Sequence, residues 1–132
     1  MDESRGVAKL VTLSALLVFG GFLLSAAALA QPYPAKPIRF VVPAPPGGGT
    51  DTVARIVGHR LSSSVGQTVV VDNRAGASGN IAARLVADAI PDGYTLFVVF
   101  ASHATNPSLF KDLGYDPIKD FSPITRLTGL PY

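Results

Sequence analysis

The stretch that most constrains this chain is Ile38–Asp51, which reads IRFVVPAPPGGGTD. A short apolar run ends in prolines and glycines, and the glycines lead directly into a segment whose apolar residues have helical spacing. The three glycines, Gly47–Gly49, have no Cβ that would keep a ligand away from the backbone. The first turn of a helix leaves N–H groups unpaired, and its dipole favours negative charge. The stretch therefore predicts a strand, a tight loop and a helix N-terminus that suit a phosphate or a carboxylate.

Residues 1–30 are typical of a secretory signal peptide. Arg5 and Lys9 give a positive start, Leu10–Leu24 is an apolar run, and Ala28–Ala30 has the small-x-small pattern that precedes a cleavage site. The same segment is also about long enough to span a bilayer as an uncleaved anchor. The abrupt change of composition at Gln31 favours cleavage, which predicts export of a folded part that begins there.

Composition narrows the function classes. The formal net charge is +2, and the basic residues after the leader are scattered, which argues against nucleic acid as a partner. There are no cysteines, so no disulfide stabilises the fold. His59 and His103 are the only histidines and do not have the spacing of metal ligands, so the sequence predicts no metal site.

Apolar periodicity alternates between strand and helix patterns after the leader. Thr50 is the expected N-cap of the first helix, with Asp51 in its first turn and Gly66 at its end. Asn80 is either the N-cap of the second helix or part of a pocket wall. The expected elements are strand Ile38–Val42, helix Thr50–Val65, strand Thr68–Val71, helix Asn80–Ala89, strand Thr95–Phe100, a polar loop Ala101–Pro107, short helical turns within Ser108–Asp120 and a fourth strand Ile124–Leu127.

Alternating strands and helices with short connections predict an α/β fold, a parallel βαβαβ sheet with flanking helices and right-handed crossovers. Such sheets bind ligands beyond the carboxyl ends of the strands, where the strand order reverses. With the strand order 2-1-3, the loops after the first and third strands face one another. Pro45–Asp51 then offers backbone N–H groups, and Ser102–Asn106 offers hydroxyl, imidazole and amide side chains.

The sequence lacks residues that the known motifs for nucleotide binding and catalysis require. A dinucleotide fingerprint needs a glycine where this chain has Thr52, and a P-loop needs a lysine that does not follow Gly49. The sequence therefore predicts no cofactor. Ser102 and His103 lie outside a G-x-S-x-G elbow, so a ligand-binding loop is favoured over a catalytic pair. Asp51 either accepts a hydrogen bond from a ligand or interacts favourably with the helix dipole. Judged by itself, Asp51 is better explained by the second role, and the two roles are compatible.

Four blocks run in register over Tyr33–Leu127: YPAKPIRFVVPAPPGGGTD, GQTVVVDNRAGASGNIAA, PDGYTLFVVFASHATNP and LGYDPIKDFSPITRL. Together they resemble the Bug/TctC family of extracytoplasmic solute-binding proteins, which are associated with tripartite tricarboxylate transporters. The resemblance implies a two-lobed periplasmic binding protein of the type II, Venus-flytrap architecture, which is not an enzyme. It implies a small organic carboxylate as ligand and the membrane permease subunits of such a transporter as partners.

In the resembling family the ligand carboxylate is held, partly through water, between the loops after the first and third strands. By motif, these loops are Ala44–Asp51 and Ala101–Thr105 in this sequence. The family often has an aromatic residue where this chain has Ala44, which predicts a bulkier substrate or a more open pocket there. The implied substrate-binding residues are Ala44, Pro46, Gly47, Gly48, Gly49, Thr50, Asp51, Ala101, Ser102, His103 and Thr105.

Members of that family are much longer than this chain. Residues 31–132 are therefore expected to form the N-terminal part of the first lobe, truncated before the second lobe, and to bind ligand weakly or not at all when isolated. Two alternatives stay open. One is an exported hydrolase-like or nucleotide-binding enzyme fragment that uses Ser102 and His103, and the other is a structural protein anchored in the membrane by its leader.

Overall fold

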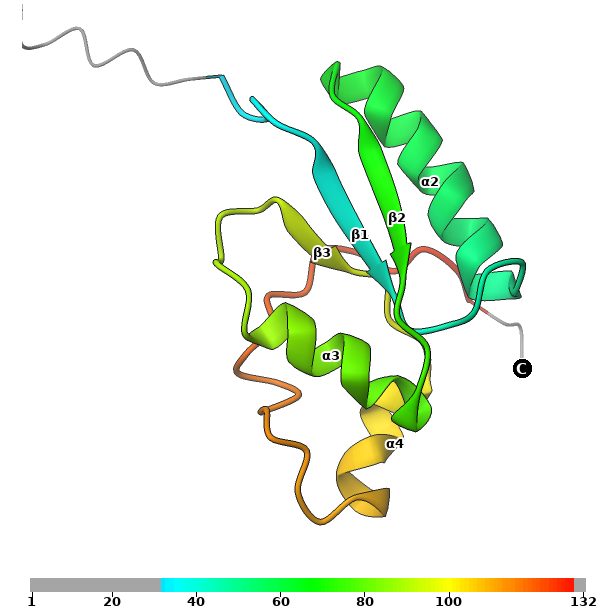
Figure 1. The fold of residues 1–132 in the computed structure, drawn as a ribbon, viewed down its shortest axis with the longest axis vertical. Helices are drawn as coiled ribbons and strands as arrows, with labels where there is room; N and C mark the ends of the chain where they lie inside the picture. Colours follow the sequence, from blue (N-terminus) through cyan, green and yellow to red (C-terminus); the bar gives the residue numbers. More distant parts are fainter. Residues whose placement is uncertain (1–31, 130–132) are drawn as a thin grey trace, which may run out of the picture. The chain divides into compact units, whose positions relative to one another are not determined.

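The structure is a computed structural model that describes residues 32–129. The predicted signal peptide, residues 1–30, lies outside the described residues. The residues from Tyr33 onward form one compact unit, built on a parallel sheet with helices packed against it (Figure 1). Among the described residues, no helix has both the length and the apolar character that a membrane span requires.

The sheet has the strands β1 (Ile38–Val42), β2 (Val69–Asn73) and β3 (Thr95–Phe97). All pairs are parallel, and the order is β2-β1-β3. In this register Phe40 of the central strand lies opposite Val71 on one side and Leu96 on the other. The predicted parallel βαβαβ architecture is confirmed, and the strand order is the one for which the loops after the first and third strands were expected to face one another.

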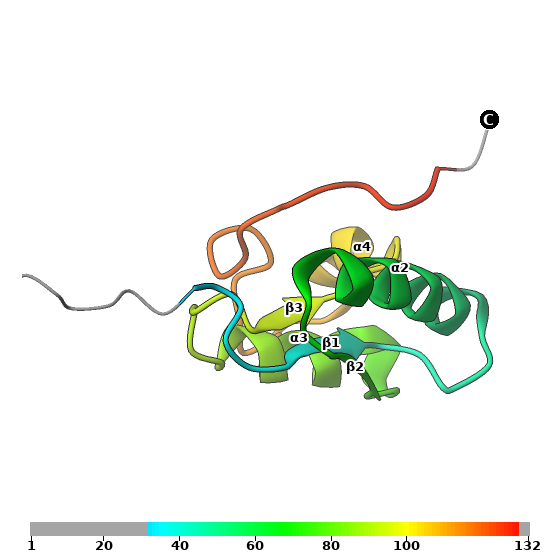
Figure 2. The ribbon, with the colours of Figure 1, turned by 90° about the horizontal axis from the view of Figure 1, so that it is seen from above.

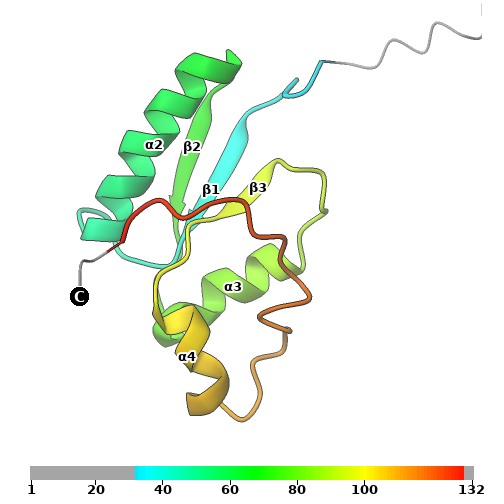
Figure 3. The ribbon, with the colours of Figure 1, turned by 180° about the vertical axis from the view of Figure 1, so that it is seen from behind.

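The helical elements are α2 (Gly49–Val65), the 3-10 turn η1 (Ala77–Gly79), α3 (Asn80–Ala87) and α4 (Ser102–Leu109). α2 packs against β1 and β2 on one face of the sheet, and α3 packs against β1 and β3 on the other, as Figure 2 shows. α4 lies beside η1 and α3, which can be followed from behind in Figure 3. The helices thus cover both faces of the sheet, as is usual for parallel sheets.

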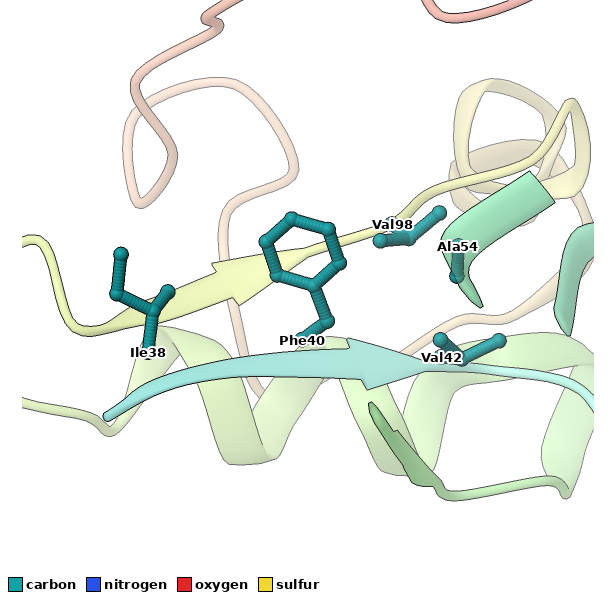
Figure 4. Close-up of a cluster of buried hydrophobic side chains, with 5 residues drawn as sticks. All are labelled: Ile38, Phe40, Val42, Ala54 and Val98. Atoms are coloured by element: carbon teal, nitrogen blue, oxygen red, sulfur yellow. The ribbon is translucent and has the colours of Figure 1, made fainter. Parts of the chain in front are cut away.

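The main core lies between the sheet and α2. Its buried side chains, drawn in Figure 4, are Ile38, Phe40, Val42, Ala54 and Val98. Alternate residues of β1 face α2 because side chains along a strand point to opposite faces. Gly58 allows close packing of α2 on β2, since a Cβ there would lie 3.2 Å from Cγ1 of Val69. This core fixes the first strand and the first helix, and so the loop that joins them.

The polar segment 101–107 is not the predicted loop, because Ser102–Leu109 forms α4. The segment has no apolar stripe, and Pro107 inside the helix lacks the N–H that a helical residue donates. A tertiary contact holds it instead, in which Ser102 Oγ donates to the carbonyl oxygen of Ser78 at 2.9 Å. Local periodicity carries no signal of such a contact, which is why the prediction was wrong.

Other predicted elements differ from the structure at their ends. β3 stops at Phe97 rather than Phe100, and residues 124–127 form no strand. Ile124 is 75% exposed, so the apolar pattern there has no sheet to join within the described part of the chain. β2 continues to Asn73, and α3 ends at Ala87. The short helical turns predicted within 108–120 reduce to the end of α4 and a turn at 117–120.

Glycines cap α2 at both ends and α3 at its start. Gly48, not Thr50, is the N-cap of α2, because the helix begins one residue earlier than the sequence indicates. Gly79, not Asn80, is the N-cap of α3. Gly66 ends α2 as predicted, in a left-handed conformation with φ of 69° and with its N–H donating to the carbonyl oxygen of Ser62 at 3.1 Å.

Candidate ligand-binding site

The carboxyl ends of the three parallel strands lie at one edge of the sheet, called here the carboxyl edge (Figure 1). The strands end there at Val42, Asn73 and Phe97. This is the edge at which parallel sheets bind ligands. The predicted substrate-binding residues all follow β1 or β3, so the topology puts both predicted groups on this edge.

The loop after β1 is exposed and has an unobstructed backbone. Gly47 has φ of +84°, and a Cβ at Gly47 or Gly49 would meet nothing within 4 Å. No side chain of the described residues caps α2, whose N-cap is Gly48. The amides of the first turn, including those of Gly49 and Thr50, therefore lack both an intrahelical and a side-chain acceptor, at the positive end of the helix dipole.

The carboxylate of Asp51 is engaged by the protein itself. Asp51 is 2% exposed. Its Oδ2 accepts hydrogen bonds from the backbone N of Gly47 and Nε of Arg55, both at 2.9 Å, and its Oδ1 accepts one from Nδ2 of Asn73 at 2.9 Å. The same Nδ2 donates to the carbonyl oxygen of Ala44 at 3.0 Å, and Nη2 of Arg55 donates to Oδ1 of Asn73 at 3.2 Å. Asp51, Arg55 and Asn73, the polar triad, thus tie the loop to α2 and to the end of β2.

The charge of this carboxylate is stabilised and compensated. Hydrogen bonds from Arg55, from the Gly47 amide and from Asn73 hold the pKa of Asp51 far below its usual range, against the opposing effect of burial. The same contact raises the pKa of Arg55. Asp51 is therefore ionised at neutral pH, and the guanidinium beside it offsets its charge. An anion that approaches the loop does not meet an uncompensated negative group.

The predicted residues after β3 lie at the start of α4. Ala101 is exposed and is the N-cap of the helix, and Thr105 Oγ1 donates to the carbonyl oxygen of Ser102 at 3.2 Å. Ser102 Oγ donates its proton to the carbonyl oxygen of Ser78, so toward a ligand it can act only as a hydrogen-bond acceptor. The hydroxyls of this segment are therefore partly used to hold α4 against η1.

A buried amide network below α4 was only partly visible in the sequence. Asn106 is 1% exposed, and its Nδ2 donates to the carbonyl oxygen of Ser78 at 3.0 Å and to Oδ1 of Asn80 at 2.6 Å. Tyr115 OH donates to the same Oδ1 at 2.8 Å, and burial raises the pKa of Tyr115. Asn106 Oδ1 has no partner among the described residues. Asn80 therefore belongs to this buried network, and Tyr115, which lies 35 residues away in the sequence, had no local signal.

His103 is held in an aromatic cluster. Its ring stacks on Tyr115 at 5.9 Å between centroids and meets the edges of Phe97 and Phe121 at 5.5 and 5.0 Å. Nε2 lies 3.2 Å from the carbonyl oxygen of Pro117, which can only accept, so Nε2 carries the proton. The imidazole thus fastens the segment after α4 to the helix.

A small hollow lies between α4 and the turn before α3. Its empty space is ≈ 140 Å³, and it is lined by Pro43, Ser78, Gly79, Ser102, His103 and Asn106 together with aromatic and valine side chains of β3 and the residues after it. That figure includes open solvent, and the hollow encloses almost no space for a water molecule, whereas small-molecule pockets usually have roughly 300–1,000 Å³. Ser102 and His103 line this hollow, whereas residues 44–51 do not. The two predicted groups therefore share the carboxyl edge, and only the second group lines this hollow.

The geometry does not support hydrolytic or metal chemistry. Ser102 Oγ donates to Ser78, and His103 Nε2 points to Pro117, so the two side chains do not form a nucleophile and its base. In the described part of the chain, no group of three or more His, Cys, Asp or Glu residues is placed to hold a metal ion.

Comparison with known proteins identifies the class. BugD, a periplasmic binding protein of known structure, matches with a TM-score of 0.67 and 46% sequence identity, over 70% of this chain and 31% of BugD. MatC from Rhodopseudomonas palustris, solved with bound malate, matches with a TM-score of 0.64 and 42% identity, over 69% of this chain and 31% of MatC. The fold of the described residues matches part of the fold of these periplasmic binding proteins.

The family model of the tripartite tricarboxylate transporter family receptor, TctC, matches residues 53–132, and the chain belongs to this family. A UPF0065 protein of Bordetella bronchiseptica is 44% identical over 128 residues, which are 96% of this chain and 37% of the relative. The chain therefore spans less than two fifths of the length of these relatives. Family membership confirms the resemblance to Bug/TctC proteins, which are solute-binding proteins and not enzymes.

Proposed function

We propose that this chain supplies part of the carboxylate site of a periplasmic receptor for a tripartite tricarboxylate-type transporter. The observation that carries the proposal is the uncapped start of α2 at the carboxyl edge, beside an acidic residue whose charge is already compensated. The malate bound by MatC, a neighbour of 42% identity, supports a small organic acid as the substrate class.

The chemistry required is recognition without reaction. Carboxylate oxygens accept hydrogen bonds from backbone N–H groups and hydroxyls, and bonds to an ionised acceptor are about twice as strong as neutral ones. The first-turn amides of α2 supply such donors, and the hollow beside α4 supplies polar and aromatic walls. The proposed substrate-binding residues remain Ala44, Pro46, Gly47, Gly48, Gly49, Thr50, Asp51, Ala101, Ser102, His103 and Thr105.

The rest of the receptor is part of the same proposal. Export to the periplasm through a cleaved signal peptide at residues 1–30, a second lobe that closes over the ligand, and delivery to permease subunits all belong to it. The chain spans 31% of MatC, so most of the surface around a bound ligand would come from segments that this chain does not contain. We therefore expect binding to this chain alone to be weaker than about 1 mM.

An NMR titration of the full-length chain with malate tests the proposal. The amide signals of Gly48, Gly49 and Thr50 are expected to shift with rising malate. The amides of Gly49 and Thr50 have no protein acceptor, and Gly48, whose amide makes only a 3.4 Å bond to the carbonyl oxygen of Pro45, adjoins them. Malamide, the uncharged diamide, is the matched control and should shift them little. Equal shifts with both compounds, or malate shifts confined to residues away from the carboxyl edge, would refute a carboxylate site at this loop.

A further inference from the structure

The polar triad joins three separate parts of the chain. Asp51 and Arg55 belong to α2, and Asn73 is the last residue of β2. Their backbone partners, the carbonyl of Ala44 and the N–H of Gly47, lie on either side of Pro45 and Pro46. The triad therefore holds the loop at two points, one before and one after its proline turn.

Little else holds this loop in place. Residues 45–47 and Gly49 are exposed, and Gly47 has no atom within 4 Å of the position of a Cβ. The carbonyl oxygen of Gly48 accepts from Thr52 N at 2.9 Å and from Thr52 Oγ1 at 3.1 Å, where α2 begins. Before that point, the other backbone bond of the described residues within the loop is from Gly48 N to the carbonyl oxygen of Pro45, at 3.4 Å. Apolar packing cannot order such a segment, so its conformation depends on polar contacts from below.

The carboxylate of Asp51 is not available to a ligand. Its side chain is 4% exposed, and its two oxygens accept three hydrogen bonds at 2.9 Å from Gly47, Arg55 and Asn73. Contact with a ligand would require these bonds to break and would leave a buried charge without its partners, which is strongly unfavourable.

We propose that Asp51, Arg55 and Asn73 are positioning residues, which hold the glycine loop so that its free amides point away from the sheet toward an anionic ligand, and that their side chains do not touch that ligand. This inference rests on the proposed function for the identity of the ligand, but not for the ordering of the loop. It separates Asp51 from the other predicted substrate-binding residues, since its carboxylate acts through the loop.

The variant Asp51→Asn tests the ordering directly, without any ligand. An asparagine has one neutral acceptor oxygen where three donors converge, so the bond from the Gly47 amide is either lost or no longer assisted by charge. Amide hydrogen exchange at Gly47 is expected to rise about tenfold or more, as expected for a lost charge-assisted bond. The amide signals of Gly48–Thr50 should shift, while those of β1 and β3 keep their wild-type positions.

Asp92→Asn is the matched control. Asp92 also accepts from a cationic side chain and a backbone amide, those of Lys36 and Tyr94, but it lies in the turn before β3, at the other edge of the sheet. Exchange at Gly47 should be unchanged in this variant. If Asp51→Asn leaves the exchange and the signals of Gly47–Thr50 at wild-type values, the triad does not position the loop and the proposal is overturned.

Two further variants keep the proposal testable if Asp51→Asn fails to fold. Arg55→Gln removes the half-exposed partner and leaves the carboxylate bonded to Gly47 and Asn73, so a smaller rise in Gly47 exchange is expected. The exchanged pair Asp51→Asn with Asn73→Asp again places one carboxylate and one amide beside Arg55. If the Gly47 amide exchanges more slowly in this double variant than in Asn73→Asp alone, the positioning role is supported. If the two variants exchange at the same rate, the positioning role is contradicted.

Malate then separates this inference from the proposed function. Wild-type protein that shows the exchange pattern but no response to malate refutes the carboxylate site and leaves the ordering of the loop intact. A wild-type response that Asp51→Asn reproduces at the same malate concentrations refutes positioning and leaves the site intact. The inference predicts that Asp51→Asn needs at least about tenfold more malate for the same shift.

Discussion

The two edges of the sheet are closed in different ways. At the edge where the strands begin, the amino edge, side chains on the surface meet one another. Tyr33 OH donates to the carbonyl oxygen of Gly93 at 2.7 Å, the rings of Tyr33 and Tyr94 lie 5.0 Å apart, and Lys36 Nζ is 2.9 Å from Asp92 and 4.3 Å from the centre of the Tyr94 ring. These contacts pair the Tyr33 hydroxyl, the Lys36 ammonium and the Asp92 carboxylate with other groups of the protein.

At the carboxyl edge, buried polar side chains hold the backbone instead. Asp51 and Asn106 are 2% and 1% exposed, and each bonds main-chain atoms of a loop. The loop after β1 so held keeps the unpaired first-turn amides of α2 at the surface, whereas the unpaired Oδ1 of Asn106 is buried. The difference shows that one edge is built for closure and the other for presenting polar groups.

The largest effect is expected from a methyl group at the carboxyl edge. Gly79 has φ of +92°, and a Cβ there would lie 3.1 Å from Cβ of Pro43, which cannot swing away. Strain and overpacking together predict that Gly79→Ala lowers the free energy of unfolding by about 2–4 kcal/mol. Urea denaturation followed by circular dichroism measures it.

The control is Gly93→Ala at the amino edge. Gly93 has φ of +82°, and its Cβ would meet the hydroxyl of Tyr33 at 3.0 Å, which is the end of an exposed side chain that can move. A loss of about 1–2 kcal/mol is expected from backbone strain. A loss at Gly93 equal to or larger than that at Gly79 would contradict the contrast between the edges.

Truncation of Asn106 should have the next largest effect. Asn106→Ala leaves the carbonyl of Ser78 without one of its two donors and opens a space below α4, so the free energy of unfolding should fall by about 1–3 kcal/mol. Asn106→Ser is a gentler control that keeps a hydroxyl. If Asn106→Ala is as stable as wild type in urea, the buried network does not hold α4.

Acid should affect the amino edge before the carboxyl edge. The pKa values of Asp51 and Asp92 are both lowered, by their hydrogen bonds to Arg55 and to Lys36 first, and the shift is larger for Asp51. A lowered pKa adds stability above the unfolded value of about 3.9, and that stability is lost as the pH falls through the folded value. The Tyr94 amide, a donor to Asp92, should titrate at higher pH than the Gly47 amide in a two-dimensional NMR series. The reverse order would contradict the account.

The smallest effect is expected from a surface hydroxyl of the amino edge. Tyr33 is 60% exposed, and its hydroxyl bonds only the carbonyl of Gly93 in the described structure. Tyr33→Phe should therefore lower the free energy of unfolding by about 0.5 kcal/mol. A loss as large as that for Asn106→Ala would show that the amino edge carries more of the stability than its exposure suggests.

The sequence predicted the scaffold because scaffold signals are local. Apolar runs and helical spacing located β1 and α2, and Gly66 marked the end of the helix through its preference for positive φ. The run Gly47–Gly49 marked the exposed loop because glycines have no Cβ, and Gly47 adopts a positive φ there. These features depend on neighbours in the chain, which a sequence displays directly.

The polar arrangement of the site could not be predicted in the same way. Asn73 reaches Asp51 across 22 residues, and the pattern around Asn73 predicted only a turn. α4 forms in a polar segment because Ser102 and Asn106 bond the carbonyl of Ser78, a contact that no helical period reports. Buried hydrogen bonds between distant segments become visible only when the fold brings them together.

The central claim is that the free amides at the start of α2 bind a carboxylate, and one pair of variants tests it most directly. Proline is favoured at the first position of a helix, and the preceding Gly48 already has the extended conformation that proline requires. Gly49→Pro therefore removes one N–H donor without disturbing α2, and Gly49→Ala keeps that donor and adds a methyl group in open space. In malate titrations followed by NMR, the account predicts that Gly49→Pro loses most of the response at Gly48 and Thr50 while Gly49→Ala keeps it. An undiminished response in folded Gly49→Pro would contradict the claim.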